Sequence, residues 1–554
     1  MSKMKVRFVT ALCLVLLFIV LLYVYSPATH VNAPASVAPG PLVECAQENK
    51  AIRAYYSTID SVPDEVVRLM TKFPKGGDLH NHLSGSVMPE DYIAIGVKAG
   101  YCYDKGSFKI KECSPGDPLL SEAGSDDIDN IKQALSMYHY DYPDIQGGHD
   151  HFFATFGKFG AVSGAYQGAM LAKLLEQASN DNVKYVETMM SFTHDAFNSL
   201  FDALTREFPD PDDYKNKENY KRMYTVLEDA GLQDAVNKAG NKITKYEEIA
   251  GDILHCDSAE PSDACSVIYR FQGEINRNPP ADNLPDASVF VQAAINFALS
   301  NADERVVAVN LVSGEDLPVS MQEFGTQMDI FSFFHNQYQD VNIALHAGEL
   351  TPCFVGEDNP ALFSHLSRSL DAGATRIGHG ISFEYLDDKQ RLEIVAEMTA
   401  KNALVEVPMT SNAQILGVTG GDHPFSLYFR LYDVPVAFAT DDEGVSYNNF
   451  TNEWVYAWRY YNLSMEEMIT LARNSLQYSF LKGQPLWTDI PLHTLSKECA
   501  NDRIGTEPQT AECRAYLNQS QKATVQWNYE IELNDYINKN RAILKTDFGY
   551  DRSG

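Results

Sequence analysis

The sequence predicts an α/β fold, a (β/α)8 TIM barrel with insertions after its first and second strands. From about residue 180 onward, short apolar and β-rich runs alternate with helical stretches, as expected of repeated βα units around a parallel sheet. The last six of these runs begin roughly 30 to 40 residues apart, which fits one strand, one helix and two loops each. Eight such units close a barrel.

The eight strands are assigned to apolar runs with the length of a buried strand. The first is expected at about Gly77–His82. The other seven are expected at Lys184–Met190, Val267–Glu274, Arg305–Val312, Asn342–Ala347, Thr375–Gly378, Ala403–Pro408 and Pro435–Thr440. Several of these runs finish in histidine or aspartate, which matters for the chemistry considered below.

Outside this repeat the chain carries several additions. About 100 residues separate the first two strands, so we predict an insertion at about residues 101–144. A second elaboration is expected at residues 208–263, between the second and third strands. We therefore expect a barrel at residues 74–484, preceded by a helical segment at residues 43–73 and followed by an extension at residues 485–554.

The first 26 residues differ in composition from the rest of the chain. Lys3, Lys5 and Arg7 precede an uncharged and mostly apolar run from Phe8 to Tyr25. This order is typical of a signal peptide or an uncleaved signal anchor at residues 1–26, and the Pro/Ala/Val-rich residues 27–42 resemble a stalk. The sequence therefore predicts a secreted or extracytoplasmic protein that contacts a membrane only through this segment.

Six of the nine cysteines form three pairs that are close in the sequence. The pairs are Cys102 with Cys113, Cys256 with Cys265, and Cys499 with Cys513. Disulfides readily close short loops of this kind in an oxidising compartment, so we predict these three bonds from proximity. Beyond the apolar N-terminal run, Cys45 and Cys353 are left, either paired or free.

The overall charge limits the class of partner. Seventy-five acidic and 44 basic residues give a formal net charge of −31. A surface this acidic repels phosphate backbones, so no nucleic acid partner is expected. The 45% of hydrophobic residues can bury a large core, which is typical of a globular protein.

Histidines and carboxylates stand at the ends of four predicted strands. His80 and His82 flank Asn81 in "GGDLHNHLSGS", and alternation along a strand puts both imidazoles on one face, where they could share a metal. "IALHAGE" places His346 at the end of a buried strand, with Glu349 on the following loop. A packed core does not require such residues there.

Two further strand ends carry polar groups. "RIGHG" holds His379 between two glycines, and "VAFATDDEG" ends in Asp441 and Asp442. Taken singly, His379 could be a turn residue and the two aspartates could cap a helix. Barrel enzymes, however, build their active sites from the C-terminal ends of several strands, and all four segments fall there.

Together these residues predict metal-assisted hydrolysis. Three imidazoles and a carboxylate form a mixed nitrogen and oxygen site that suits zinc or a similar divalent ion and leaves a position for water. Such a metal lowers the pKa of water toward neutrality. Glu349 could then shuttle a proton, and His379 could orient or stabilise the attacking hydroxide.

The segments "PKGGDLHNHLSGS", "LHAGE", "RIGHG" and "ATDDEG", in this order, resemble the adenosine deaminase family of metal-dependent amidohydrolases, over about residues 74–481. The resemblance implies hydrolytic deamination of adenosine and 2′-deoxyadenosine, with one zinc ion per chain and a purine nucleoside as partner. The implied zinc ligands are His80, His82, His346 and Asp441. Glu349 would protonate purine N1 and His379 would steer the hydroxide toward C6. Asp442 would contact N7, and the backbone of Gly314 in "LVSGED" would meet N3.

One position departs from the family pattern. Members that act on free nucleosides often carry aspartate after His-x-His-Leu, where it meets the ribose 5′-hydroxyl, but this chain has Ser84. Serine can still hydrogen bond there without a fixed charge. The leader and the insertion also make the chain similar to the secreted branch that includes the adenosine deaminase-related growth factors. In that branch an N-terminal helical extension and a disulfide-bearing insertion support dimerisation and surface binding. Only about 30 residues separate the stalk from Pro74 here, so a dimer is possible but unsupported.

Alternatives remain at this point. A related amidohydrolase could act on an N6-substituted adenine nucleoside, a nucleotide or adenine, and a growth-factor-like binding protein could have lost the chemistry. The motifs of the other zinc deaminase class, His-x-Glu and Pro-Cys-x-x-Cys, are absent. "HDHFFATFGKF", residues 149–159, could supply aromatic walls to a purine site, but its helical spacing favours a place in the core.

Overall fold

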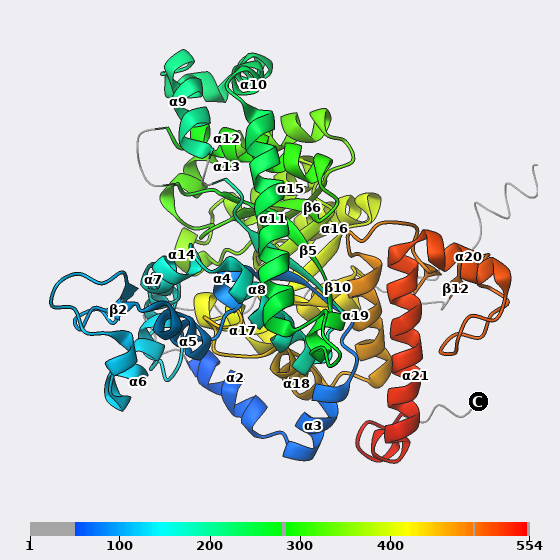
Figure 1. Ribbon diagram of the computed structural model, residues 1–554. Coiled ribbons are helices and arrows are strands. Elements are labelled where there is room, and N and C mark those ends of the chain that lie inside the picture. Colours follow the sequence, from blue (N-terminus) through cyan, green and yellow to red (C-terminus); the bar gives the residue numbers. More distant parts are fainter. Residues whose placement is uncertain (1–49, 194–195, 280–283, 491–493, 551–554) are drawn as a thin grey trace, which may run out of the picture. The chain divides into compact units, whose positions relative to one another are not determined.

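Eight parallel strands form the centre of the computed structural model, which describes residues 50–193, 196–279, 284–490 and 494–550 (Figure 1). They follow one another in chain order: β1 (Gly77–His82), β4 (Tyr185–Met190), β5 (Ile268–Asn276), β6 (Val306–Val312), β7 (Asn342–Ala347), β8 (Arg376–His379), β9 (Leu404–Val407) and β10 (Val436–Phe438). Asp441, just after β10, bridges to β1: its N–H donates to the His80 carbonyl at 2.9 Å, and its carbonyl accepts from His82 N at 3.2 Å. The sheet is thus a nearly closed barrel, and the predicted fold class and all eight strands are confirmed.

Helices surround the strands. They include α8 (Gln167–Asn180), α12 (Pro285–Ala302), α13 (Pro318–Gln337), α15 (Ala361–Asp371), α16 (Asp388–Lys401), α17 (Met409–Leu416), α18 (Phe450–Tyr461) and α19 (Met465–Gln477). In α13, Phe324, Met328 and Phe331 recur every three or four residues and are buried, so they occupy one face of the helix. That face packs against α12 and α15.

The segment between β1 and β4 is more ordered than a plain loop. It contains α4 (Leu83–Ser86), α5 (Pro89–Ala99), β2 (Cys102–Tyr103), β3 (Ile110–Lys111), α6 (Ser125–Leu135) and α7 (Ile145–Ser163). The predicted insertion at residues 101–144 holds the β2–β3 hairpin and α6. Asp144 then caps α7 by accepting a hydrogen bond from Gly147 N, and α7 packs on α17. The insertion therefore leads into a helix that touches the barrel end.

The second predicted elaboration is mostly helical. It follows α9 (Phe197–Glu207) and contains α10 (Tyr220–Asp229) and α11 (Leu232–Leu254). Helix α11 packs along α8 and α12, on the outside of the barrel.

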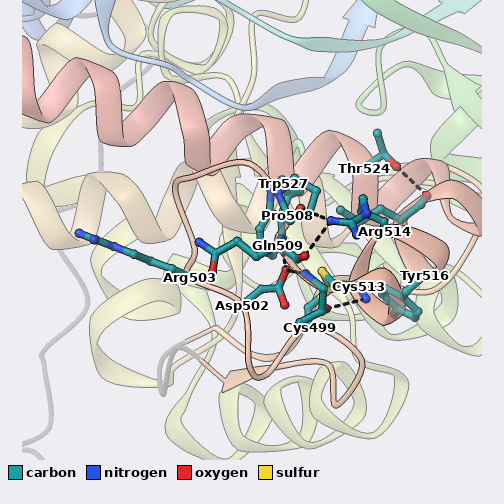
Figure 2. Close-up of a disulfide and its surroundings, with 12 residues drawn as sticks. Cys499, Asp502, Arg503, Pro508, Gln509, Cys513, Arg514, Tyr516, Thr524 and Trp527 are labelled. Carbon is teal, nitrogen blue, oxygen red and sulfur yellow. Dashed lines mark hydrogen bonds between the residues drawn. A yellow bond between two sulfur atoms is a disulfide. The ribbon is translucent and has the colours of Figure 1, made fainter.

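The first and last helices that the structure describes pack on the outer helices of the barrel. The N-terminal α2 (Lys50–Asp60) and α3 (Asp64–Lys72) both contact α18 (Figure 1). After the barrel come β11 (Trp487–Asp489), β12 (Thr494–Leu495), α20 (Ala511–Gln519) and α21 (Gln521–Asp547), and α21 lies against α19. Figure 2 shows the inside of this extension, where Asp502 accepts backbone hydrogen bonds from Gln509 and Thr510. The extension has a small core of its own that includes Trp487 and Trp527.

The three disulfides predicted from proximity are present. They join Cys102 with Cys113, Cys256 with Cys265, and Cys499 with Cys513. Cys353 is disulfide-bonded as well, and Cys45 lies outside the described residues.

The predicted location is overturned. Among the residues that the structure describes, no helix is long and apolar enough to cross a membrane. The run on which we based the signal or anchor, residues 1–26, and the stalk at residues 27–42 lie outside the described residues. The prediction of a secreted or membrane-anchored protein rested on hydropathy alone and is withdrawn.

Candidate active site

Four predicted ligands meet at the C-terminal end of the barrel. His80 and His82 both point inward from β1, His346 comes from β7, and Asp441 follows β10. One ligand atom from each lies within 4.8 Å of all the others. His82 Nε2 is 3.1 Å from His346 Nε2, and Asp441 Oδ1 is 3.5 Å from His80 Nε2 and 3.3 Å from His82 Nε2. The structure therefore brings the four residues to one point.

The other ring nitrogen of each histidine is held by a neighbour. His80 Nδ1 lies 2.7 Å from Glu406 Oε2 and His346 Nδ1 lies 2.9 Å from Asn310 Oδ1. His82 Nδ1 lies 3.3 Å from Glu274 Oε1. When Nδ1 donates to such an acceptor, the tautomer is fixed and Nε2 is left with a lone pair that faces the other ligands.

The donor set fits a divalent metal. His80 Nε2 is buried and has no hydrogen-bond partner in the described part of the chain, although a buried nitrogen rarely stays unpaired. Burial opposes ionisation, but the neighbouring imidazoles hold the pKa of Asp441 well below its ordinary value. Three imidazoles and one ionised carboxylate suit zinc or a similar ion.

Electrostatics also set the protonation of two of these histidines. Burial and the neighbouring imidazoles hold the pKa of His346 well below its ordinary value, which favours the neutral, ligating form. Burial lowers the pKa of His80, but the carboxylates of Asp441 and Glu406 outweigh it and raise that pKa to about 9. A cation bound here would compete with that proton.

Glu349 and His379 stand beside the four ligands. Glu349 follows Gly348, whose φ of +72° allows the tight turn after β7. Burial and the charges of Asp441 and Glu315 raise the pKa of Glu349 well above its ordinary value, so its carboxyl holds a proton. His379 Nδ1 lies 2.8 Å from Asn412 Oδ1, and its Nε2 lies 3.7 Å from Asp441 Oδ2. Burial lowers the pKa of His379 to about 4, so its ring is neutral.

Of the three predicted substrate-binding residues, two line the cavity and one lies behind its surface. Asp442 and Ser84 line the cavity. Burial is the main cause that raises the pKa of Asp442 to about 8. Gly314 is not among the lining residues, which include its neighbours Ser313 and Leu317; the Gly314 carbonyl accepts a hydrogen bond from Asn278 Nδ2. Gly314 thus belongs to the wall just behind the surface.

These residues open into a cavity of about 950 Å³. Helix α7 supplies one wall through His149, Phe152, Phe153 and Phe156. Phe159, by contrast, is buried and stacks on Tyr92. The preference for a core position is correct for Phe152 and Phe159, which are buried, and wrong for Phe153 and Phe156, which are partly exposed on the cavity side of α7.

The charged side chains that line the cavity are acidic. Among the described residues, no lysine or arginine lines it. Five acidic side chains do: Asp150, Glu274, Glu349, Asp441 and Asp442. The cavity therefore has no fixed cation that could pair with a phosphate group.

The supporting residues were missed in the sequence. Glu274, Asn310 and Glu406 each lie within a predicted strand that is otherwise mostly apolar. A polar residue inside a buried strand needs a partner, and that signal could have identified them. Asn412, which contacts His379, gave no comparable signal because it lies on a short helix after β9.

The fold and this site are those expected of a barrel hydrolase, with three histidines and a carboxylate that could hold a metal ion. The adenosine deaminase family profile matches residues 285–485, which contain His346, Glu349 and His379. Over these residues the chain is similar to the adenosine deaminase family.

Individual relatives are similar to different shares of the chain, and the chain spans only about half or less of two of the curated relatives that it matches. The adenosine deaminase of Lactococcus lactis subsp. lactis is 28% identical over 423 residues, which cover 74% of this chain and 90% of that protein. An adenosine deaminase-like protein of Drosophila pseudoobscura pseudoobscura is 26% identical over 40% of this chain and 56% of its own length. The adenosine deaminase of Enterococcus faecalis, at 33% identity, is matched over 26% of this chain and only 37% of its length. The crystal structure of Arabidopsis N6-mAMP deaminase aligns with a TM-score of 0.46 at 18% identity, covering 74% of this chain and 95% of that one.

Proposed function

We propose that this protein catalyses the zinc-dependent hydrolytic deamination of adenosine and 2′-deoxyadenosine to inosine and deoxyinosine, with release of ammonia. One observation carries the proposal: three imidazoles and a carboxylate meet at one point, beside a protonated Glu349 and a neutral His379, in a cavity large enough for a nucleoside. A hydrolase that replaces an amino group with oxygen needs these groups together.

One zinc ion per chain would be held by His80, His82, His346 and Asp441. When bound, it would make hydroxide available from water at neutral pH and stabilise developing negative charge. His80 Nε2, which is otherwise unpaired, supports this assignment.

The remaining roles belong to side chains of this chain. The raised pKa of Glu349 keeps a proton that the carboxyl can donate to purine N1, which makes C6 more electrophilic. Asn412 holds His379 Nδ1, so His379 Nε2 is free to accept a hydrogen bond from the attacking oxygen. The pKa of Asp442 near 8 allows its carboxyl to donate to N7, an acceptor. The backbone at Gly314 would approach N3, and Ser84 would meet the sugar.

The charge of the cavity favours a neutral substrate. A 5′-phosphate would enter a site whose described lining contains several carboxyl groups and no lysine or arginine. The whole chain is also strongly acidic, with a net charge of −31. We therefore propose a nucleoside as the partner and neither a nucleotide nor a nucleic acid.

A related substrate is the second candidate. An N6-mAMP deaminase of Arabidopsis thaliana is 28% identical over 34% of this chain and 47% of that protein. The cavity of about 950 Å³ has space for an N6-substituent, and the same residues would release an amine in place of ammonia. A binding protein without activity is disfavoured because each proposed ligand and the proton donor are in place.

The test is a steady-state assay on adenosine, 2′-deoxyadenosine, N6-methyladenosine, AMP, N6-methyl-AMP and adenine, with metal analysis of the same sample. We expect about one equivalent of zinc and the highest kcat/KM on adenosine and deoxyadenosine. A preference for N6-methyl-AMP would favour the second candidate. Purified protein with neither bound divalent metal nor activity on any of these compounds would contradict both.

A further inference from the structure

A buried carboxylate lies behind the loop that carries Glu349. Glu315 follows β6 in the segment "SGED", and its side chain is inaccessible to solvent. It is not among the residues that line the cavity, so it does not touch a substrate there. Its contacts lie instead with the loop after β7.

The two oxygens of Glu315 bind consecutive backbone amides of that loop. Oε1 accepts from Gly348 N at 3.1 Å and Oε2 accepts from Glu349 N at 2.7 Å. Gly348 lies in the left-handed region, and its carbonyl accepts from Ser382 N at 2.8 Å. The backbone of the turn is therefore held from both sides, and the turn sets the direction in which the Glu349 side chain leaves it.

Two cationic or donor groups hold Glu315 in turn. His365 Nδ1 lies 2.6 Å from Oε1, and its ring stacks on Phe324 with centroids 3.6 Å apart. Arg277 NH1 lies 3.9 Å from the same oxygen, while Arg277 NH2 donates to the His346 carbonyl at 2.7 Å. Arg277 thus links Glu315 to the other end of the His346–Glu349 loop.

The ionised form of Glu315 is favoured. Burial opposes ionisation, but the hydrogen bond and charge of His365, with Arg277, hold the pKa of Glu315 below its ordinary value. An ionised carboxylate has only acceptor oxygens, which is what two converging N–H groups require. Glutamine would present one oxygen and one NH2 group, and the NH2 would face an amide donor.

We propose that Glu315, held by His365 and Arg277, is a positioning residue that fixes the Gly348–Glu349 backbone and so aims the Glu349 carboxyl at the substrate. The inference rests on the proposed function, in which Glu349 donates the proton. Misplacement of a reacting group by about 1 Å can lower a rate by about 100-fold, so the positioning has a measurable consequence.

The test compares Glu315→Gln and Glu315→Asp with the wild-type full-length chain. We expect Glu315→Gln to lower kcat on adenosine by about 10- to 100-fold with KM changed less than about threefold, and Glu315→Asp to recover part of the loss. Hydrogen–deuterium exchange of the peptide with Gly348 and Glu349 should be about 10-fold faster in Glu315→Gln, because the amides lose an acceptor.

Two matched variants separate positioning from general damage. Asp502 is also a buried carboxylate that accepts from two consecutive backbone amides, but it lies in the C-terminal extension (Figure 2). Asp502→Asn should increase exchange around Gln509 and Thr510 and not at Gly348. The second matched pair changes His365, the donor to Glu315. His365→Phe keeps a ring against Phe324 but removes the N–H, whereas His365→Asn keeps an N–H. We expect the larger loss of kcat from His365→Phe.

The outcomes are distinguishable. Wild-type kcat and wild-type amide exchange in Glu315→Gln would overturn the inference, and so would equal losses in the two His365 variants. If the wild-type protein deaminates none of the compounds tested, the proposed function fails, while the exchange experiment still decides whether Glu315 holds the loop. If Glu315→Gln does not fold, the His365 pair carries the test.

Discussion

The two ends of the barrel differ in what faces their buried polar groups. At the C-terminal end, His80 Nε2, His379 Nε2 and Asp442 Oδ1 are buried and have no hydrogen-bond partner among the described residues. Toward the N-terminal end, the buried Arg376 guanidinium is ion-paired with Glu187 at 2.6 Å and with Glu406 at 2.7 Å, although Arg376 Nε and Glu406 Oε1 make no well-aligned hydrogen bond. An unpaired buried polar atom costs free energy unless a ligand satisfies it. The first end is therefore arranged for a ligand and the second for stability.

The N-terminal end is also covered by the chain. Phe480 N donates to Glu187 Oε1 at 2.7 Å, and the Phe480 ring lies 3.9 Å from the Arg376 guanidinium. Helix α21 adds a buried bidentate pair, Arg473 with Glu530, at 2.7 and 2.9 Å. Barrel enzymes in general place chemistry at the C-terminal end and stability at the other.

The two ends share one residue. Glu406 Oε2 binds His80 Nδ1, and Glu406 Oε1 faces Arg376. The ion pair near the N-terminal end thus also orients His80, a proposed metal ligand at the C-terminal end, as supporting residues of metal sites commonly do.

The largest expected effect is on kcat, from a change at the C-terminal end of the barrel, where the cavity lies. Glu349→Gln removes the proton that the carboxyl donates, so we expect kcat on adenosine to fall by about 1,000-fold or more. The ligands are untouched, and burial already favours a neutral side chain, so zinc content and the free energy of unfolding should be retained. Absorbance of adenosine, metal analysis and urea unfolding measure the three quantities.

Glu357→Gln is the matched control, because Glu357 is exposed on the same connection between β7 and α15. Its kcat should stay at the wild-type level. Near wild-type turnover in Glu349→Gln would refute the role assigned to Glu349.

Toward the N-terminal end of the barrel, which the chain covers, we expect the free energy of unfolding to change most. Arg376→Met leaves the carboxylates of Glu187 and Glu406 buried without their cation, which should lower the free energy of unfolding by about 3 to 5 kcal/mol. Urea unfolding measures the change. Lys482→Met is the control, since its pair with Glu304 is exposed and should contribute nothing measurable. Equal stability of the two variants would contradict the stabilising role assigned to the N-terminal end.

The contrast also shows what could be predicted from the sequence. The strands are located correctly because they are apolar runs with a regular spacing. Polar residues at the ends of such strands have no role in packing, and this pattern already grouped the four side chains that the structure brings together. His80 and His82 were placed on one face by strand periodicity alone.

Residues that act across long sequence distances could not be predicted in the same way. Glu406 reaches His80 over 326 positions, and Glu315 reaches Glu349 over 34, so neither pairing follows from local pattern. The wall formed by α7 depends on how that helix lies across the barrel. The location prediction failed because it rested on hydropathy and on no structural feature of the described chain.

A smaller effect tests how tightly the open end is packed. A Cβ added at Gly85 would lie 1.5 Å from Asp442 Oδ1, so Gly85→Ala must displace that carboxyl. We expect kcat/KM on adenosine to fall by about 10- to 100-fold while zinc is retained.

In the control Gly251→Ala, on α11, the added Cβ meets nothing within 4 Å. This variant should keep full activity and gain up to about 1 kcal/mol of stability, because alanine favours a helix. Wild-type kcat/KM in Gly85→Ala would show that Asp442 does not need its present position.

The smallest effect is on how stability depends on pH. It separates a buried carboxyl that faces another carboxyl from one that faces an arginine. Asp286 is buried at the start of α12 and shares a hydrogen bond with Glu323, and burial with this second carboxyl raises the pKa of Asp286 to about 7. Between the unfolded pKa near 3.8 and about 7, the folded chain binds the extra proton, so stability from this group is lost as the pH rises. From pH 5 to pH 8, wild type should therefore lose about 3 kcal/mol relative to Asp286→Asn in urea unfolding.

Asp303 provides the opposite case. Burial raises its pKa, but the hydrogen bonds and charge of Arg305 outweigh burial and hold the pKa below its ordinary value. Its stabilising contribution is complete above the unfolded pKa near 3.8 and is lost only as the pH falls below it, so Asp303→Asn should differ from wild type by the same amount at pH 5 and pH 8. A pH-independent difference for Asp286→Asn as well would mean that the two carboxyls do not share a proton, and that the pair is tolerated in its ionised form beside Lys215, whose Nζ lies 3.4 Å from Glu323 Oε1.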